Sequence, residues 1–552
     1  MSYNQPGNQF NKFNEGNNNR QGVKPSAFFP LLFAAMLAIG VMLGYAINPG
    51  SGSSSFDPND KLNSVISLIR KEYVDKVDAE DLTNKAIEGM LKDLDPHSVY
   101  LSPKLVKETN EELAGQFGGV GIQFIIYNDT LSVSHTVKKG PAEKKGIQAF
   151  DRILMVGKKK FTGKKITNEQ VFEALRGEVG TPVTLKVYRP STGKTFEAKV
   201  VRGVIPVPSV DCAIMLSQNV GMIRISQFGE NTFADFLNEA RKLKDMGMKK
   251  LILDLRDNGG GYLEQAQNIA DQFLKDRVKI VYTKGHNQGR QDYLASATGE
   301  LEDMPLVVLV NHNSASASEI VAGAIQDNDR GAIVGRRTFG KGLVQQQFGP
   351  FDDGSALRLT VSRYYTPSGR CIQKPYGNGI DYYHESIDRF ENDEFYKPDS
   401  SKCVDSLKCL TINKKRKVYG GGGIMPDVFV PLDTSFNTLF YARVSHPEKN
   451  IINAFAFQYV ERNKSRLSDF KTTTKFNVSF IVDESLWSAF KEYASSKGVK
   501  PDNEADEMRA KRWISVLIKA EIGRLTFNNE GYYLIRMIND TEVKRSMNSF
   551  WN

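Results

Sequence analysis

The sequence predicts an α/β protein that also carries a separate β-rich module, an N-terminal transmembrane helix and a helical C-terminal extension. Between Val220 and Pro367, short apolar strands alternate with amphipathic helices, a pattern typical of α/β domains. Residues 115–204 instead contain short β-runs with only two helical stretches between them. Because 552 residues are too many for one hydrophobic core, we expect several structural units.

One apolar segment near the N-terminus is long enough to span a bilayer. Residues 27–47 contain no charged side chain, and Arg20 and Lys24 precede them. Because positively charged flanks stay on the cytoplasmic side, we expect residues 1–26 in the cytoplasm and a single pass through the inner (cytoplasmic) membrane. The rest of the chain would then be periplasmic or otherwise extracytoplasmic. A cleaved signal peptide is the alternative, since Ala46 is a small residue suited to cleavage.

The chain after this segment divides into four parts. Residues 56–114 show helical periodicity and are expected to form the helical N-terminal part of the main body. Residues 115–204 form the β-rich module. The α/β core occupies residues 205–432 and includes a polar, turn-rich insertion at 376–419. Residues 433–552 form the helical C-terminal extension.

The expected strands are short runs of β-branched and apolar residues. In the module they are Val120–Ile126, Leu131–Val133, Arg152–Val156, Val183–Tyr188 and Phe196–Val201. In the core they are Val220–Ile225, Leu251–Leu255, Val278–Tyr282, Leu306–Val310 and Ala332–Val334. Helices are expected at Pro141–Lys145, Asn168–Leu175, Thr232–Met246 and Leu263–Leu274.

Composition argues against several classes of function. The formal net charge of +9 is spread along the chain, so we expect no nucleic-acid binding. The four cysteines lack the paired spacing of a zinc site. We therefore expect neither a metal nor another cofactor.

A serine-rich turn, residues 311–319, follows the predicted strand Leu306–Val310 and leads into an apolar helical run. A nucleophile at Ser316 would lie on a sharp bend, where the free N–H groups of the helix start can stabilise an oxyanion. This arrangement suits acyl transfer. The alternative is that Ser314, Ser316 and Ser318 are helix caps and close-packing residues, because serines in such a position also serve as helix caps.

Lys341 is the second candidate for chemistry. It lies between two glycines at the start of a predicted strand, whose alternation places Leu343 and Gln345 on the same face. Leu343 would exclude water from the amine, and desolvation lowers the pKa of a lysine toward the range in which it accepts a proton from serine. Gln345 would orient the amine. Gly335–Lys341 also match the beginning of a P-loop, but the glycine and β-like sequence that follow do not fit one.

His312 offers a rival general base, because it lies a few residues before Ser316 and would suit a Ser-His-Asp triad. It stands at the end of a predicted strand, where a histidine is more often structural. The pairing of Ser316 with Lys341 is therefore the preferred hypothesis.

A second glycine-rich segment, Gly118–Phe124, leads into the first strand of the module. Successive backbone N–H groups in such a loop can hold the terminal carboxylate of a peptide while the peptide adds to the adjacent sheet edge. An ordinary tight turn is the alternative.

Together these segments resemble the carboxyl-terminal processing proteases, also called tail-specific proteases, from about residue 60 to residue 432. The resemblance rests on motifs whose joint order and spacing are specific: Leu94–Ser98, Gly118–Phe124, Gly140–Ala142, Gly146–Ile147, Asp151–Ile153, Asp254–Gly261, Ser314–Glu319, Gly340–Gly342 with Gln345, Tyr365–Gly369 and Gly423–Asp427. It implies a protease core similar to the crotonase and Clp-protease class, with a PDZ domain at residues 115–204.

The resemblance also implies roles for individual residues. The family's nucleophile falls on Ser316, its general base on Lys341 and its lysine-orienting glutamine on Gln345. The oxyanion donors would be the N–H groups of Ala317 and of Gly261 or Gly260. The PDZ loop that receives the end of the peptide would comprise Gly119, Val120, Gly121 and Ile122.

The expected function is that of a serine endopeptidase that recognises the carboxyl-terminal tails of extracytoplasmic proteins through its PDZ domain. Two features depart from the family pattern: Phe150 stands where glycine is usual, and the insertion at 376–419 is additional. The extension would serve dimerisation, shielding of the site or docking of an adaptor protein. Two alternatives remain, a membrane-anchored PDZ scaffold on an inactive protease-like fold, and an esterase or amidase with the same Ser-Lys pair.

Overall fold

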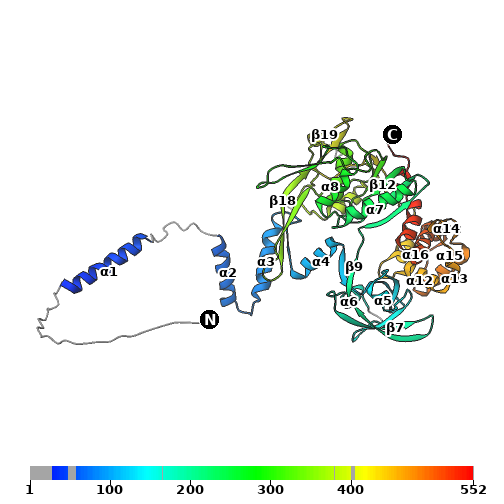
Figure 1. Ribbon diagram of the computed structural model, residues 1–552, viewed down its shortest axis with the longest axis horizontal. Helices are drawn as coiled ribbons and strands as arrows, with labels where there is room; N and C mark the ends of the chain where they lie inside the picture. The colour runs from blue at the N-terminus through cyan, green and yellow to red at the C-terminus, as the bar shows by residue number, and fades with distance from the viewer. Residues whose placement is uncertain (1–27, 48–57, 164–165, 378–379, 399–403, 551–552) are drawn as a thin grey trace, which may run out of the picture. The chain divides into compact units, whose positions relative to one another are not determined.

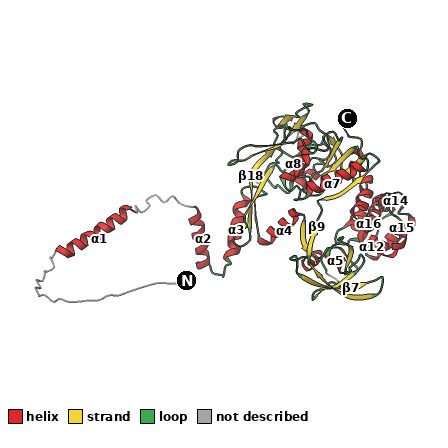
Figure 2. Ribbon diagram, viewed as in Figure 1, coloured by secondary structure: helices red, strands yellow, loops and turns green. Residues whose placement is uncertain are grey.

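The computed structural model describes residues 28–47, 58–163, 166–377, 380–398 and 404–550. By its internal contacts the chain divides into two compact units, Met1–Ala86 and Ile87–Asn552. Figure 1 labels the elements along the chain. Among the described residues, the first unit contains helices only, and the strands belong to the second (Figure 2).

The first unit begins with helix α1, Phe28–Ile47, which covers nearly all of the predicted transmembrane segment. Within the described part of the chain, no helix combines the length and the hydropathy needed to cross a membrane. The anchor at residues 27–47 therefore stays a prediction, and the predicted tail, residues 1–26, lies outside the described residues. Helix α2, Pro58–Glu72, follows, and helix α3, Ala79–Lys92, begins in this unit.

The β-rich module forms a six-stranded antiparallel sheet in which the order is β3-β4-β5-β7-β8 and β6 pairs with β5. Its elements are β3 (Ile122–Tyr127), β4 (Thr130–Thr136), α5 (Pro141–Lys144), β5 (Arg152–Val156), β6 (Lys159–Lys160), α6 (Asn168–Leu175), β7 (Pro182–Arg189) and β8 (Lys194–Val201). Strands β2 (Gln116–Gly119) and β9 (Gly203–Pro206) pair with each other where the chain enters and leaves the module. Every strand and helix predicted for the module is present, with ends shifted by at most a few residues.

The core contains a six-stranded sheet of order β10-β11-β12-β15-β16-β21, which is parallel except for β10. Its strands are β10 (Val210–Met215), β11 (Val220–Ile225), β12 (Lys250–Asp254), β15 (Leu306–Val310), β16 (Ala332–Gly335) and β21 (Val428–Phe429). Its inner strands are apolar runs buried on both faces, as parallel strands covered on both sides require. Helices α7 (Thr232–Asp245), α8 (Leu263–Asp271) and α9 (Ala317–Asp327) pack on one face.

A second sheet of the core was largely absent from the prediction. It contains β1 (Val99–Leu101), β13 (Lys279–Lys284), β14 (Gln291–Leu294), β17 (Leu343–Phe348) and β18 (Ala356–Tyr365). Helix α4, Pro103–Ala114, follows β1 and ends at Gly115 in the left-handed conformation. Of these strands, only β13 and the start of β17 coincide with predicted ones.

The insertion at 376–419 is built into the core. It contains α10 (Glu385–Glu391) and the hairpin of β19 (Lys408–Leu410) and β20 (Lys417–Tyr419). The buried guanidinium of Arg389 donates to the carbonyl oxygens of Arg337, at 2.7 Å, and Thr338, at 3.1 Å. The insertion therefore supports the turn that leads toward Lys341.

The C-terminal extension is helical, as predicted. It contains α11 (Leu439–Ser445), α12 (Ile451–Arg462), α13 (Lys464–Leu467), α14 (Thr473–Ser479), α15 (Glu484–Ser496), α16 (Glu504–Asn539) and α17 (Thr541–Ser546). Helix α16 breaks at Phe527 and Asn528, where the backbone is not helical. Residues 439–526, up to this break, form a helical domain, called the extension domain from here on, which supplies most of the residues of one aromatic-rich hydrophobic cluster. After the break, Leu534 and Met537 pack against the second face of the six-stranded sheet.

Candidate active site

Ser316 stands on the turn between β15 and α9. It is the N-cap of α9, with φ 56° and ψ −113°, a backbone conformation that residues other than glycine rarely adopt. Such a conformation persists only where the surroundings fix it. The serine is therefore presented on a sharp bend, as the sequence predicts.

The two neighbouring serines fix this turn. Ser314 Oγ donates to the carbonyl oxygen of Leu255 at 2.8 Å, and Ser318 Oγ donates to that of Asn258 at 2.9 Å. The N–H of Ala315 also donates to the carbonyl oxygen of Asn258, at 3.0 Å. Both serines hold the Ser316 turn against the loop that follows β12.

This loop brings glycine backbone next to the serine. A Cβ atom on Gly260 would lie 2.7 Å from the Cβ of Ser316, so only glycine allows this approach. The N–H of Gly260 donates to Asn258 Oδ1 at 2.9 Å. The N–H groups of Gly261 and Ala317, in contrast, have no acceptor among the described residues. The geometry favours Ala317 and Gly261 as oxyanion donors, since Gly260 is already engaged.

The buried carboxylate of Glu319 joins the serine turn to the lysine loop. One oxygen accepts from Thr338 Oγ1 at 2.5 Å and from the N–H of Gly340 at 2.8 Å. The other accepts from the N–H groups of Ser316 and Lys341, both at 2.9 Å. Burial raises the pKa of Glu319 to about 7, although these hydrogen bonds oppose the shift.

A buried tyrosine adds a second link between the same two segments. The hydroxyl of Tyr364 donates to the carbonyl oxygen of Lys341 at 2.5 Å and to that of Ser316 at 3.1 Å. Ser316 and Lys341 are thus tied together through their backbones by Glu319 and Tyr364. Neither link was predicted, although Glu319 lies within one of the quoted motifs.

Lys341 is in the environment that a lysine base needs. Burial lowers its pKa to about 8, and the positive charge of Arg358 acts in the same direction. The carboxylates of Glu319 and Asp95 oppose both effects. Leu343, predicted to exclude water, is 2% exposed. Among the described residues, no hydrogen bond joins the amine of Lys341 to the hydroxyl of Ser316, and such bonds often tighten only when substrate is bound.

Gln345 lines the same cavity, but among the described residues its side chain is hydrogen-bonded to Thr360 and not to the amine of Lys341. The register of β17 and β18 shifts between Val344 and Gln345, so the simple alternation is broken there. Gln345 Nε2 donates to Thr360 Oγ1 at 3.3 Å, and Thr360 Oγ1 donates to Asp95 Oδ1 at 3.0 Å. In the described structure no hydrogen bond joins Gln345 to Lys341. The roles of Thr360 and Asp95 were not predicted, although Asp95 belongs to the motif Leu94–Ser98.

The predicted catalytic residues share one cavity of about 700 Å³. Its lining includes Ser316, Ala317, Lys341, Gln345, Gly260 and Gly261. The structure thus brings together residues from separate loops, as a catalytic constellation requires.

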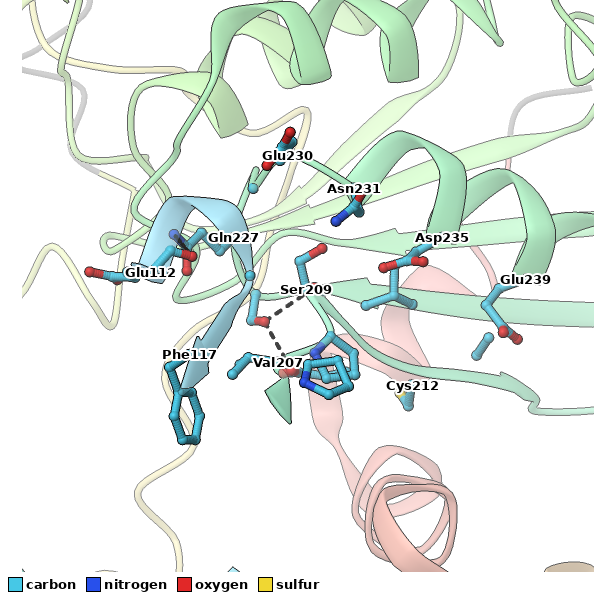
Figure 3. A pocket seen from close by; sticks show the side chains of 18 of the residues that line it. Glu112, Phe117, Val207, Ser209, Cys212, Gln227, Glu230, Asn231, Asp235 and Glu239 are labelled. Atoms are coloured by element: carbon cyan, nitrogen blue, oxygen red, sulfur yellow. Dashed lines mark hydrogen bonds between the residues drawn. The ribbon is translucent and has the colours of Figure 1, made fainter. Parts of the chain in front are cut away.

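A larger cavity of about 1020 Å³ adjoins the first (Figure 3). The two share Glu112, Ser226 and Gln227. Figure 3 shows its side chains arising from the end of α4, the linker after β9 and helix α7. Because Phe117 and Arg176 of the β-rich module also line it, this cavity extends from the module to the catalytic cavity.

His312 lies away from this site. Its ring stacks on Phe395 with centroids 4.3 Å apart, and it lines a separate cavity with Arg336. Burial lowers its pKa to about 4. The structure gives no support to a base at His312.

The glycine-rich loop of the module has free donors. The N–H groups of Val120 and Gly121 have no acceptor among the described residues, while the carbonyl oxygens of both are engaged. Gly121 has a φ of 78°, which favours glycine. Strand β3, which begins at Ile122, is the edge of its sheet. Gly119 ends β2 immediately before these donors.

Within the described residues, no group of three histidine, cysteine, aspartate or glutamate side chains is arranged to hold a metal ion.

Comparisons with known families match most of the chain. The profile of peptidase family S41 matches residues 219–383, and that of the PDZ domain matches residues 118–200. The N-terminal domain of the activating protease CtpB matches residues 48–104. Residues 440–528 match a family of unknown function.

Several curated proteins are similar to the chain. A carboxy-terminal-processing protease of Bartonella bacilliformis is 37% identical over 338 residues, which cover 60% of this chain and 76% of that protein. The carboxy-terminal processing protease CtpB of Bacillus subtilis is 35% identical over 318 residues, 57% of this chain and 65% of that protein. A probable CtpA-like serine protease of Staphylococcus epidermidis is 31% identical over 452 residues, 81% of this chain and 84% of that protein.

Among solved structures, the photosystem II D1 C-terminal processing protease is 28% identical, with a TM-score of 0.33, and covers 70% of this chain and 90% of its own. The sequence similarity to processing proteases extends over most of their length. The chain therefore belongs to peptidase family S41, the carboxy-terminal processing proteases, and is a serine-type peptidase with a PDZ domain.

Proposed function

We propose that Ser316 and Lys341 form a catalytic dyad that cleaves extracytoplasmic proteins whose carboxyl-terminal tails the PDZ domain captures. The observation that carries the dyad is the half-buried side chain of Lys341, with a pKa lowered to about 8, in the same cavity as a serine on a strained turn. A lysine with this pKa is partly neutral near physiological pH and can accept a proton.

The reaction begins when the neutral amine of Lys341 takes the proton of the Ser316 hydroxyl as Oγ attacks the scissile carbonyl carbon. The N–H groups of Ala317 and Gly261 receive the negative charge that develops on the carbonyl oxygen. The ammonium of Lys341 then gives its proton to the departing amine, which leaves an ester on Ser316. Lys341 next removes a proton from water as the water oxygen attacks the ester carbon. The ester bond to Oγ then breaks, the acid is released, and the ammonium of Lys341 returns its proton to Oγ of Ser316.

Gln345 has a positioning role in this mechanism. Its Nε2 already donates to Thr360. This orientation leaves Oε1 as an acceptor for the protonated amine of Lys341. The Asp95–Thr360–Gln345 chain of hydrogen bonds would therefore hold the ammonium in place during proton transfer.

Tail capture is assigned to the loop Gly119–Ile122. The free N–H groups of Val120 and Gly121 support it as the site of a terminal carboxylate, and the edge strand β3 supports strand addition by the tail. From there the adjoining cavity offers the substrate a route to Ser316. A PDZ scaffold without catalysis is less favoured, because binding alone does not require a half-buried lysine of lowered pKa in the same cavity as a strained serine turn.

The extracytoplasmic location rests on the sequence of residues 27–47, an uncharged apolar segment preceded by positive charge. We infer a single pass with the catalytic part outside the inner membrane. Protease added to intact spheroplasts should then degrade the catalytic part, and washing membranes with carbonate should not release the protein. Release by carbonate would contradict the anchor.

The test of the function is cleavage of an unfolded reporter with an apolar carboxyl-terminal tail by the wild type and by Ser316→Ala. We expect loss of cleavage in the variant and retained binding of the tail. An amidated tail should bind more weakly, because it cannot offer a carboxylate to the loop. Equal cleavage by Ser316→Ala would place the nucleophile elsewhere, and binding without cleavage by the wild type would favour a scaffold.

A further inference from the structure

The extension domain, residues 439–526, packs against the PDZ domain through three sets of contacts. The family that matches residues 440–528 has no known function. The hydrophobic cluster of the extension domain includes two buried side chains from the PDZ domain, Tyr127 and Phe150.

Phe150 is the centre of the contact. Its φ is 73°, in the region that favours glycine, yet its side chain is only 7% exposed. Its ring lies 4.8 Å from that of Phe457, and Lys464 Nζ lies 4.2 Å from its centroid. The turn itself is fixed inside the PDZ domain, because Asp151 Oδ2 accepts from the N–H of Gln148 at 2.9 Å. A strained phenylalanine is therefore presented outward into the extension domain.

Arg152 forms the polar part of the contact. Its NH2 group donates to both carboxylate oxygens of Glu461 at 2.8 Å, and its NH1 group donates to the carbonyl oxygen of Phe150 at 2.7 Å. The guanidinium also lies over the rings of Tyr127 and Phe457, at 5.3 and 5.1 Å. The side chains of Arg152 and Glu461 are only 12% and 22% exposed, which reduces screening by water.

The third set involves strand β3, the edge strand assigned to tail capture. Gln458 Nε2 donates to the hydroxyl of Tyr127, at the end of β3, at 3.0 Å. Lys497 Nζ donates to Asn128 Oδ1, in the following turn, at 3.3 Å. Ile125 packs on the same cluster. The extension domain therefore supports the strand that receives the substrate.

The other end of the extension is fixed to the protease core. On either side of the break at Phe527, Gly523 and Gly531 lie so close that a Cβ on Gly531 would be 2.4 Å from the carbonyl oxygen of Gly523. The chain then continues to Asp540 and Glu542, both of which pair with the buried Arg256. A helix held to the catalytic sheet thus connects directly to the domain that contacts Phe150.

We propose that the extension domain is an intramolecular docking domain that fixes the position of the PDZ domain on the protease by holding Phe150 and Arg152. Phe150 is then a specific anchor, which explains why this chain has a strained phenylalanine where the family usually has glycine.

Hydrogen–deuterium exchange of the full chain tests this proposal, with Ser316→Ala in every sample to prevent self-cleavage. Glu461→Arg places two like charges face to face, so amides of β3, its following turn and residues 148–152 should exchange about tenfold faster or more. The double variant Arg152→Glu/Glu461→Arg should regain most of the protection. Asp502→Arg is the matched control, because the ion pair of Asp502 with Arg443 lies within the extension domain and away from Phe150.

Phe150→Gly is the second test and relieves the backbone strain while removing the anchor. It should accelerate exchange in the same segments and leave α6 and β7 of the PDZ domain protected, since the PDZ core does not contain Phe150. Unchanged exchange in both Glu461→Arg and Phe150→Gly would overturn the proposal. The proposal would also be overturned if the amides of the double variant exchanged as fast as those of Glu461→Arg alone. None of these results depends on peptidase activity, so they are separable from the assignment of the dyad.

Discussion

Ser316 and Phe150 both have a positive φ, 56° and 73°, but their side chains are in different surroundings. Ser316 is held through its backbone, by hydrogen bonds to Glu319 and from Tyr364. The backbone of Phe150 is hydrogen-bonded too, to the carbonyl oxygen of Val133 and from Arg152, but here the side chain is also fixed, because it packs on Phe457 and under Lys464. Hydrogen bonds to the backbone leave the serine hydroxyl free for chemistry, whereas packing uses the whole side chain of Phe150. In the proposed roles, the same kind of strain serves reaction at one place and domain contact at the other.

The largest expected effect separates stability from activity at Ser316. Ser316→Gly should reduce kcat/KM by about 10³-fold or more, because the nucleophile is gone. It should also raise the free energy of unfolding by about 1 kcal/mol, because glycine adopts this φ without strain. Peptidase assays and denaturant unfolding measure the two quantities. A variant less stable than the wild type would mean that the turn is not strained.

Glu319 tests whether backbone hydrogen bonds hold the Ser316 turn. In Glu319→Gln an amide NH2 group must face N–H donors, which leaves buried donors unpaired and should cost about 2–3 kcal/mol in unfolding free energy. We also expect kcat/KM to fall by about 10- to 100-fold, because Ser316 and Lys341 lose their common acceptor. Glu264→Gln is the control, because the side chain of Glu264 is exposed on helix α8, and it should match the wild type. Wild-type kinetics in Glu319→Gln would contradict the link.

Phe150 should respond in the opposite sense to Ser316. Phe150→Gly relieves strain but loses a buried ring, so we expect a net loss of about 1–3 kcal/mol. Phe150→Ala should be less stable than Phe150→Gly by about 1 kcal/mol, because alanine keeps the strain without the packing. Chemical denaturation of the three proteins checks this order. If glycine stabilised the protein here as at Ser316, packing would not be what holds Phe150.

The smallest expected effect is a shift in pH dependence. Because Lys341 acts in its neutral form, kcat/KM of the wild type should rise with pH through a midpoint near its pKa of about 8. Arg358 disfavours the ammonium form, so Arg358→Gln should raise the pKa of Lys341 and move the midpoint to higher pH. Stopped assays across the pH range measure the shift. A midpoint that moved to lower pH would contradict the electrostatic explanation.

The sequence was sufficient to predict the strands that are buried on both faces. Strand β15 is an uninterrupted apolar run and was predicted with its observed ends, as was β11. Strand β18 was missed because polar residues such as Arg358, Thr360 and Ser362 interrupt it. These side chains are polar because the strand lies beside the catalytic cavity, so its pattern differs from that of a buried strand.

The site was predicted at the level of residues but not of their connections. Ser316 and Lys341 were identifiable from their local turns and from the family resemblance. The orientation of Gln345 depends on a shift in register between two strands, which local alternation does not reveal. The sequence shows that Phe150 departs from the family pattern. Its partner Phe457 lies about 300 residues away in the sequence, so the contact that explains this phenylalanine could be found only in the structure.

The most direct test of the Ser-Lys dyad is kcat/KM of Lys341→Met for the tailed reporter. Methionine keeps a similar length and suits a buried position, and the backbone bonds of residue 341 to Glu319 and Tyr364 remain possible. We predict a loss of about 10³-fold or more, with tail binding unchanged. Activity within about tenfold of the wild type would contradict Lys341 as the general base.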